Sequence, residues 1–401
     1  MAITDEDSAR AWLETQTDQQ VRTALAARAA LRATPAIGEE FGEALAWVAL
    51  PVLRAVITAS VAAVVLPGRT AQTLKTSSVQ AAEIAKEAAE SAYSEANSAA
   101  RCSSHAAFTA SGSNTLSSAS SAIKYSTVAS YFDQKTYREN RSVVYSACDW
   151  DADYLTSNRK DEPTSKSIFY RPLWPSEAFR DFPTGEPLGL VQHYAKLTEF
   201  FDGNPDTWGF WKRWLEGMRT GDPMDWSLQE QIALIGSTDE DRFSVWEGEN
   251  APQRIAGKIE FIEARYEAAK ANKRLQAALA KATQSRFEVG GNFPPEPLEG
   301  VSTSVPSAIF KSLTEATATL SEELEKEAPD KEELEKSASS LRDALRKCRT
   351  YLAKTADNAA QKAVGTAAVS GSAELISWIS AKQSLIGALL DALQRLLPLV
   401  S

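Results

Sequence analysis

The chain has 401 residues, of which 43% are hydrophobic and 24% are charged, and its formal net charge is −10. This composition is typical of a folded protein with two or three cooperating units and not of a disordered chain. The acidic balance, without a Lys/Arg-rich run, argues against nucleic-acid binding, which needs a basic face. Two histidines and three cysteines without paired spacing exclude a Cys/His zinc module and a disulfide framework, and they predict a reducing, cytoplasmic location.

Residues 1–67 are predicted to form helices, and they contain the most apolar stretch of the chain, 44–66. The 23 residues of this stretch could cross about 30 Å of hydrocarbon. Pro51 and Arg54 lie near its middle, and an arginine at the centre of a bilayer costs roughly 2.5–3.5 kcal/mol. We therefore expect two buried helical pieces that meet near Pro51, with a membrane span as the alternative.

Residues 71–131 are rich in alanine and serine, which make up 31 of the 60 residues from Ala71 to Ser130. Alanine is a strong helix former because it loses no side-chain entropy when a helix forms. Small side chains also let helices approach closely. We expect thin helices packed backbone to backbone here, with a flexible, adaptable segment as the alternative.

Residues 150–285 form the Trp-rich part of the predicted helical body, which covers 1–289. Seven of the ten tryptophans lie between residues 150 and 250. Trp208, Trp211 and Leu215 recur at helical spacing, so we expect most of these indoles in a core, with an exposed ligand platform as the alternative. Isoleucines at Ile255 and Ile259 open the pattern of a long helix over 252–285.

Several features of this body carry a resemblance to other proteins. Besides the Ala-rich middle they include Ala11-Trp-Leu, Ala24-Leu-Ala-Ala-Arg-Ala-Ala-Leu-Arg32, Pro172-Leu-Trp-Pro175, Trp208-Gly-Phe-Trp-Lys-Arg-Trp-Leu-Glu-Gly-Met218 and Asp225-Trp-Ser-Leu-Gln-Glu-Gln-Ile-Ala-Leu-Ile235. With these stretches, residues 8–297 resemble a loose group of uncharacterised, Ala-rich, all-helical proteins of proteobacteria that have a Trp-rich central motif. The resemblance implies a bacterial cytoplasmic protein and carries no catalytic residue.

A Gly/Pro-rich stretch, 290–305, is predicted to be a linker, and 306–401 is expected to be a separate helical unit. Leu313, Leu320 and Leu324 form one helical stripe, and Asp330-x-x-Glu333 is a capping motif for the next helix. These two helices resemble an antiparallel hairpin. Strand alternation of useful length is absent from the sequence. The predicted fold class is therefore all-α, a multi-helix bundle body with a C-terminal helical hairpin and an amphipathic helix.

The sequence contains none of the local motifs that cradle phosphates, bind dinucleotides, hold a catalytic metal or present a nucleophile. Asp149, Asp151 and Asp153 match the first ligand positions of a calcium loop, but Tyr154 and Lys160 stand where glycine and glutamate are required. The acidic run is therefore expected to be a solvated helix end or a capping cluster. We predict no catalytic residue, no cofactor and no metal.

The two histidines offer little for catalysis. His105 lies three residues after Cys102, so a helix could place both on one face, but no local acid would orient the histidine. His193 is expected to be half-buried and satisfied. An enzyme that uses carboxylates from separate helices is kept as the third hypothesis for function.

The C-terminal tail carries the strongest indication of function. Its small residues Ala363, Ala367 and Gly371 form a ridge with i, i+4, i+8 spacing, which favours close helix contact. An amphipathic helix follows, and its apolar face includes Leu375, Ile379, Ile386, Leu389, Leu393 and Leu397. We predict that these nine residues bind a protein partner or a second copy of the chain.

The preferred hypothesis is therefore a non-enzymatic helical scaffold or interaction protein. A bacterial effector that acts on membranes through 44–66 and 373–400 is the second hypothesis. Membrane contact is less favoured because Lys382 and Arg395 are the only bases on the polar face of the C-terminal helix. Packing of that helix against the chain's own hairpin, 309–352, is the alternative to any binding role.

Overall fold

The structure, a computed structural model, describes residues 2–40, 42–65, 69–112, 115–130, 137–157, 165–175, 185–237, 245–288, 304–326, 329–361 and 385–400. Within these ranges the chain forms α-helices and short 3-10 helices and no β-strand, which confirms the predicted all-α class. The chain divides into two compact units, unit 1 (Met1–Ile259) and unit 2 (Glu260–Ser401). Residues 290–303 of the predicted linker, 290–305, lie outside the described residues. Helix α12 begins at Ser304.

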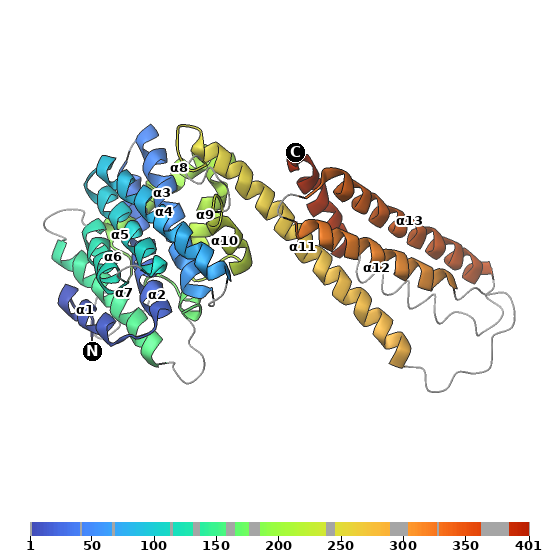
Figure 1. The fold of residues 1–401 in the computed structure, drawn as a ribbon, viewed down its shortest axis with the longest axis horizontal. Helices are drawn as coiled ribbons and strands as arrows, with labels where there is room; N and C mark the ends of the chain where they lie inside the picture. Colours follow the sequence, from blue (N-terminus) through green and yellow to red (C-terminus); the bar gives the residue numbers. More distant parts are fainter. Residues whose placement is uncertain are drawn as a thin grey trace. The chain divides into compact units, whose positions relative to one another are not determined.

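Unit 1 is a multi-helix bundle (Figure 1). Its α-helices are α1 (Glu6–Thr15), α2 (Gln19–Ala33), α3 (Glu43–Val64), α4 (Arg69–Ser91), α5 (Ser94–Ser111), α6 (Thr115–Ala129), α7 (Tyr137–Ser157), α8 (Leu188–Gly203), α9 (Pro205–Thr220), α10 (Trp226–Ala233) and the start of α11 (Ala251–Glu288). Its 3-10 helices are η1 (Thr34–Glu39) and η2 (Ser167–Tyr170). Helix α5 lies at the centre of the N-terminal part, where it contacts α2, α3, α4 and α6.

Helices α4 and α5 owe their close packing to small side chains. Ala81, Ala82 and Ala85 of α4 are fully buried together with Ala107 of α5. The hydroxyl of Ser104 donates to the Ala82 carbonyl on the neighbouring helix, 2.8 Å away. Because alanine and serine keep little volume between the backbones, these helices bury their surface without large side chains, as the composition predicts.

Helix α3 runs from Glu43 to Val64 without interruption at Pro51, where the sequence predicts two pieces. Packing of this apolar helix against α2, α4, α5 and α10 outweighs the loss of the one backbone hydrogen bond that proline cannot make. Among the described residues, α3 is the one helix long and apolar enough to cross a membrane, and 78% of its most apolar window is buried inside the fold. That burial is typical of a core helix.

The Trp-rich helix α9 supplies some of the largest side chains in the core of unit 1. Trp208, Trp211 and Trp214 are buried, and the rings of the last two meet edge to face with centres 6.0 Å apart. The indole N–H of Trp214 donates to Oε1 of Gln229 on α10, 2.8 Å away. Because a buried indole needs such an acceptor, these tryptophans serve as core residues and not as an exposed platform.

Unit 2 contains the rest of α11, the hairpin of α12 (Ser304–Leu324) and α13 (Lys331–Gln361), a helix over 385–396 and the 3-10 helix η3 (Leu397–Leu399). The predicted cap at the start of α13 is present, because Oδ1 of Asp330 accepts the N–H of Glu333 at 3.0 Å. Leucines from all four α-helices share one core, namely Leu275, Leu279, Leu313, Leu320, Leu324, Leu334, Leu341, Leu389, Leu393 and Leu396.

Candidate functional site

Two arginines one turn apart on α2 are buried in unit 1. Arg28 and Arg32 are 0% and 1% exposed. Nε of Arg28 donates to Oδ2 of Asp151 on α7 at 2.8 Å. Its two terminal nitrogens donate to three backbone carbonyls of the segment 165–175, at 2.7, 3.1 and 2.7 Å. Arg28 therefore joins three separate elements of unit 1.

Arg32 binds the same carboxylate and the same segment. Its Nη2 donates to Oδ2 of Asp151 at 2.6 Å. Its Nε and Nη2 both donate to the carbonyl of Leu173, at 2.9 and 2.7 Å. The guanidinium also lies 5.6 Å from the ring centre of Trp174, close enough for a cation–π contact. Together, the two arginines and Asp151 hold the segment 165–175 against α2 and α7.

This network contains two guanidinium groups and one carboxylate. Burial lowers the pKa of Arg28 to about 10, although the neighbouring Asp151 opposes the shift. Arg28 is therefore charged at neutral pH, and neutral backbone carbonyls accept the hydrogen bonds that the single carboxylate cannot. The network orders the backbone segment 165–175.

Within the acidic run 149–153, Asp149 and Asp151 do not form the solvated helix end or capping cluster that the sequence predicts. Asp149 and Asp151 are buried within α7, and Oδ1 of Asp149 accepts the N–H of Ile3 at 2.7 Å. The signal that could have revealed the network is the pair Arg28 and Arg32, four residues apart in the otherwise apolar stretch 24–33. A charge at such a position requires a buried partner.

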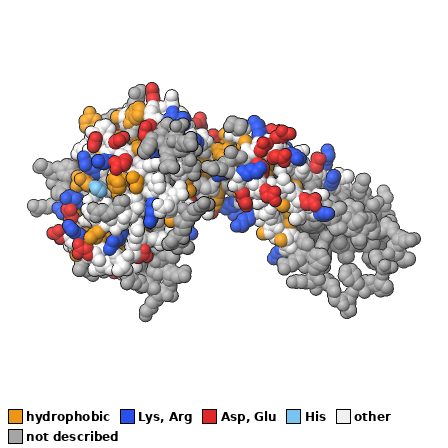
Figure 2. Space-filling model, viewed as in Figure 1, with side chains coloured by type: hydrophobic (Ala, Val, Ile, Leu, Met, Phe, Trp, Pro, Cys, Tyr) orange, Lys and Arg blue, Asp and Glu red, His pale blue; other side chains and the backbone are white. Residues whose placement is uncertain are grey.

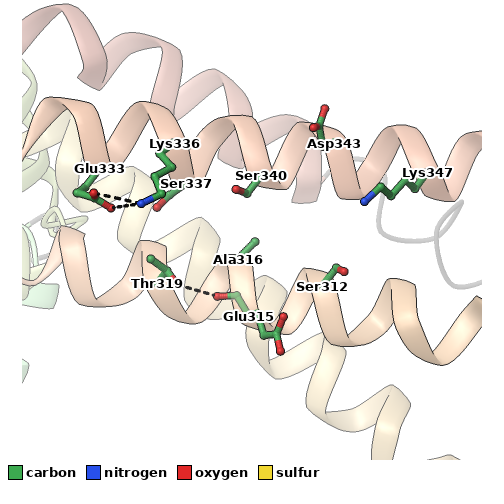
Figure 3. A pocket seen from close by; sticks show the side chains of 10 residues that line it. All are labelled: Ser312, Glu315, Ala316, Thr319, Glu333, Lys336, Ser337, Ser340, Asp343 and Lys347. Carbon is green, nitrogen blue, oxygen red and sulfur yellow. Dashed lines mark hydrogen bonds and ion pairs between the residues drawn. The ribbon is translucent and has the colours of Figure 1, made fainter.

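A groove of about 460 Å³ lies along the seam between α12 and α13 in unit 2 (Figure 3). Its lining comes from both helices, with Ser312, Glu315, Ala316 and Thr319 on α12 and Glu333, Lys336, Ser337, Ser340, Asp343 and Lys347 on α13. Figure 3 shows Ser340 of α13 across from Ala316 of α12 near the middle of the groove. Small side chains at this level leave the space between the helices unfilled.

Small side chains form the floor of the groove, and charged side chains form its rims. Ala316 and Ser337 are 8% and 4% exposed, and the hydroxyl of Ser337 has no hydrogen-bond partner among the described residues. On the α13 rim, Nζ of Lys336 lies 3.3 Å from the Glu333 carboxylate, and these side chains are 71% and 44% exposed. An ion pair that exposed contributes little stability. The rim charges can therefore exchange partners at small cost.

The nine predicted interaction residues fall into two groups. Five of them lie outside the described residues: Ala363, Ala367, Gly371, Leu375 and Ile379. The other four belong to the core of unit 2 or pack against it: Ile386, Leu389, Leu393 and Leu397. The described part of the amphipathic helix is therefore occupied by its own unit.

His105 and Cys102 share α5 but have separate partners. Sγ of Cys102 donates to the carbonyl of Ala122 at 3.0 Å, and the ring of His105 stacks on Tyr125 with centres 5.5 Å apart. Burial raises the pKa of the Cys102 thiol, so this thiol stays protonated. Within the part of the chain that the structure describes, no group of three or more His, Cys, Asp and Glu side chains is placed to hold a metal ion.

No family model, no curated protein and no solved structure matches this chain. The resemblance of residues 8–297 to Ala-rich proteobacterial proteins therefore stays a prediction. The groove between α12 and α13 is one feature of the described residues that is open to another molecule.

Proposed function

We propose that this chain is a non-enzymatic helical interaction protein whose α12–α13 groove receives a helix of a protein partner. The groove carries the proposal because small side chains form its floor while charges of both signs line its rims. Small side chains permit close approach of another helix. Charges beside a helix seam select the partner and its orientation, as in coiled coils.

The groove has the length of a short helix. Along α13 it extends from Glu333 to Lys347, which at 1.5 Å per residue is roughly 21 Å, or about four helical turns. A helix of that length would lie over Ala316, Ser337 and Ser340 with small side chains of its own. The buried hydroxyl of Ser337 would then find a hydrogen-bond partner on the incoming helix.

The surface and the thiols support the same proposal. Figure 2 shows acidic and basic side chains interspersed on the visible face, which supports a protein partner over nucleic acid. Cys102 and Cys148 are buried free thiols, as expected in a reducing cytoplasm. The burial of α3 supports a protein that does not use this helix to enter a membrane.

Native size measurements test this function. The full-length protein is sized in the lysate of the cells that make it and again after purification. We expect a mass above that of the monomer in at least one setting, and we expect Ser340→Trp, which fills the groove, to remove that complex. Ser339→Trp is the matched control, because Ser339 is exposed on α13 but does not line the groove. A lone monomer in both settings would contradict the proposal.

A further inference from the structure

The charges along α13 are complementary to the same helix in reverse. From its N-terminal to its C-terminal end, the groove side of α13 presents Glu333, Lys336, Asp343 and Lys347. Their signs alternate as negative, positive, negative, positive, so the reversed order is the opposite at every place. An antiparallel copy centred on residue 340 would set Glu333 beside the partner's Lys347 and Lys336 beside the partner's Asp343.

The centre of this arrangement is the place where a second helix can come closest. Ser340 lies at the midpoint between Glu333 and Lys347, and Ser337 lies one turn before it. Ala316 of α12 faces the same level of the groove (Figure 3). With side chains this small at the crossing, two helix axes can approach to about 8 Å, the close end of the usual range.

The spacing of the groove residues also suits a paired helix. Glu333, Ser337, Ser340 and Lys347 are separated by four, three and seven residues. A seam that repeats every 3.5 residues stays on the facing side of two helices that wind around each other. The charged ends of this seam and its small centre therefore lie on one face of α13.

We propose that α13 pairs antiparallel with α13 of a second copy of this chain, with the two-fold axis at Ser340. This inference rests on the proposed role of the groove as an interaction surface, and it identifies the occupant. The interface is isologous, so each groove receives the helix that forms one wall of the other. Because the floor of the groove has small side chains and its rims are charged, the association draws on close packing and charge pairing and weakens as salt is added.

The intramolecular pairs on α13 do not block this association. The Lys336–Glu333 pair and the Arg346–Asp343 pair, at 3.3 and 3.2 Å, both join exposed side chains. Such pairs contribute little to the monomer. The same carboxylates can therefore accept hydrogen bonds from the second copy.

A charge exchange tests the pairing. Purified full-length protein is followed by sedimentation over a concentration series at low salt, where a monomer–dimer equilibrium is expected. Lys336→Glu places two carboxylates side by side, at position 336 and at the partner's Asp343, and it does so twice in each dimer. Their repulsion should weaken dimerisation about tenfold or more. Adding Asp343→Lys to the same chain restores both pairs with reversed signs and should return most of the affinity. Lys331→Glu changes the same charge outside the groove and should leave the equilibrium unchanged.

Cross-linking tests the position of the axis. In a chain with Cys348→Ser, oxidation of Ser340→Cys should give a disulfide-linked dimer, and Ser339→Cys should not. A disulfide requires Cα atoms about 4.4–6.8 Å apart, a distance that only residues near the axis and on the facing side of α13 reach. Cys102 and Cys148 are buried and stay in both variants.

The outcomes separate this inference from the proposed function. A dimer whose affinity is unchanged by Lys336→Glu and that does not cross-link at position 340 would overturn the antiparallel pairing. If Ser340→Trp still disrupted that dimer, the groove would remain supported as an interaction surface. A purified monomer that joins a larger complex in lysate would overturn self-pairing alone. A monomer in both settings would contradict both proposals.

Discussion

In unit 1 the arginines Arg28, Arg32 and Arg54 are at most 1% exposed, whereas in unit 2 the pairs Lys311–Glu315 and Arg346–Asp343 join side chains that are 55–78% exposed. A buried charge is costly unless it is paired and hydrogen-bonded, and an exposed pair contributes little. The three buried arginines of unit 1 therefore act on its own fold. The exposed pairs of unit 2 remain available to another molecule.

Within unit 1 the buried arginines also differ from one another. Arg54 on α3 has a contact of 3.5 Å from Nη2 to Oε1 of Gln80, and its Nε and Nη1 have no partner among the described residues. Its guanidinium lies 4.5 Å from the ring centre of Trp246. Burial lowers the pKa of Arg54 to about 9, although Glu247 opposes the shift. Arg54 is thus a buried charge that lacks the carboxylate that Arg28 and Arg32 share.

Removing the shared carboxylate should have the largest effect. Asp151→Asn leaves two buried guanidinium groups without a counter-charge, so we expect unit 1 to lose about 3–5 kcal/mol of unfolding free energy. Nine of the ten tryptophans lie in residues 1–259, so denaturant unfolding followed by tryptophan fluorescence reports this unit. Asp153→Asn, on the same helix but partly exposed, is the control and should cost under about 1 kcal/mol.

A core leucine of the C-terminal helix should have the next largest effect, because unit 2 depends on apolar packing. Leu389 is 0% exposed, so Leu389→Ala should destabilise unit 2 by about 2–5 kcal/mol. The loss should appear in the helical circular-dichroism signal, while the tryptophan fluorescence transition of unit 1 keeps its midpoint. Leu390→Ala, at a half-buried neighbouring position, should cost less. Equal losses from the two variants would contradict the described burial.

Arg54 should respond with the opposite sign. Arg54→Met removes a buried charge whose Nε and Nη1 have no partner among the described residues, and it keeps the volume apolar, so we expect unit 1 to gain about 2 kcal/mol. Arg32→Met is the matched variant on α2, and it should instead destabilise unit 1, because Asp151 would lose one of its two arginines. If both substitutions destabilise unit 1 equally, the guanidinium of Arg54 is stabilised as well as that of Arg32, and the expected difference between the two arginines is wrong.

The smallest effect concerns a buried carboxyl at the start of α5. Oε2 of Glu39 in η1 accepts the N–H groups of Glu95 and Ala96 at 2.9 and 3.3 Å. Burial, together with the hydrogen bond to Glu39, raises the pKa of Glu95 from 4.5 to about 7. This group therefore contributes stability that is complete below pH 4.5 and is lost as the pH rises through 7.

Between pH 6 and 8 this titration should raise the unfolding equilibrium constant of unit 1 by roughly tenfold, or about 1 kcal/mol. Glu95→Gln keeps a neutral, isosteric side chain, so the pH dependence should shrink by that amount and stability at pH 8 should rise. His193 lies near Glu39, and its lowered pKa makes a contribution of the opposite sign below about pH 6.5. Glu90→Gln, on an exposed position of α4, should leave the pH profile unchanged.

The groove and the arginine network differ in how far they could be predicted. The hairpin that forms the groove follows from local spacing, since Leu313, Leu320 and Leu324 define one helix face and Asp330 caps the next helix. The network does not, because Arg28 and Asp151 are 123 residues apart in the chain. No local pattern indicates that an arginine of one helix will meet an aspartate of another at that distance.

The all-helical fold and the course of most helices follow from the sequence, because alanine content, apolar spacing and capping residues act over a few neighbouring residues. The packing partner of each apolar face follows from the tertiary structure. Helix α3 and the helix over 385–396 both carry faces that could meet a membrane, a partner or a core, and both are buried in their own units. Burial depends on helices distant in the chain, so the small-floored groove between α12 and α13 emerged from the structure alone.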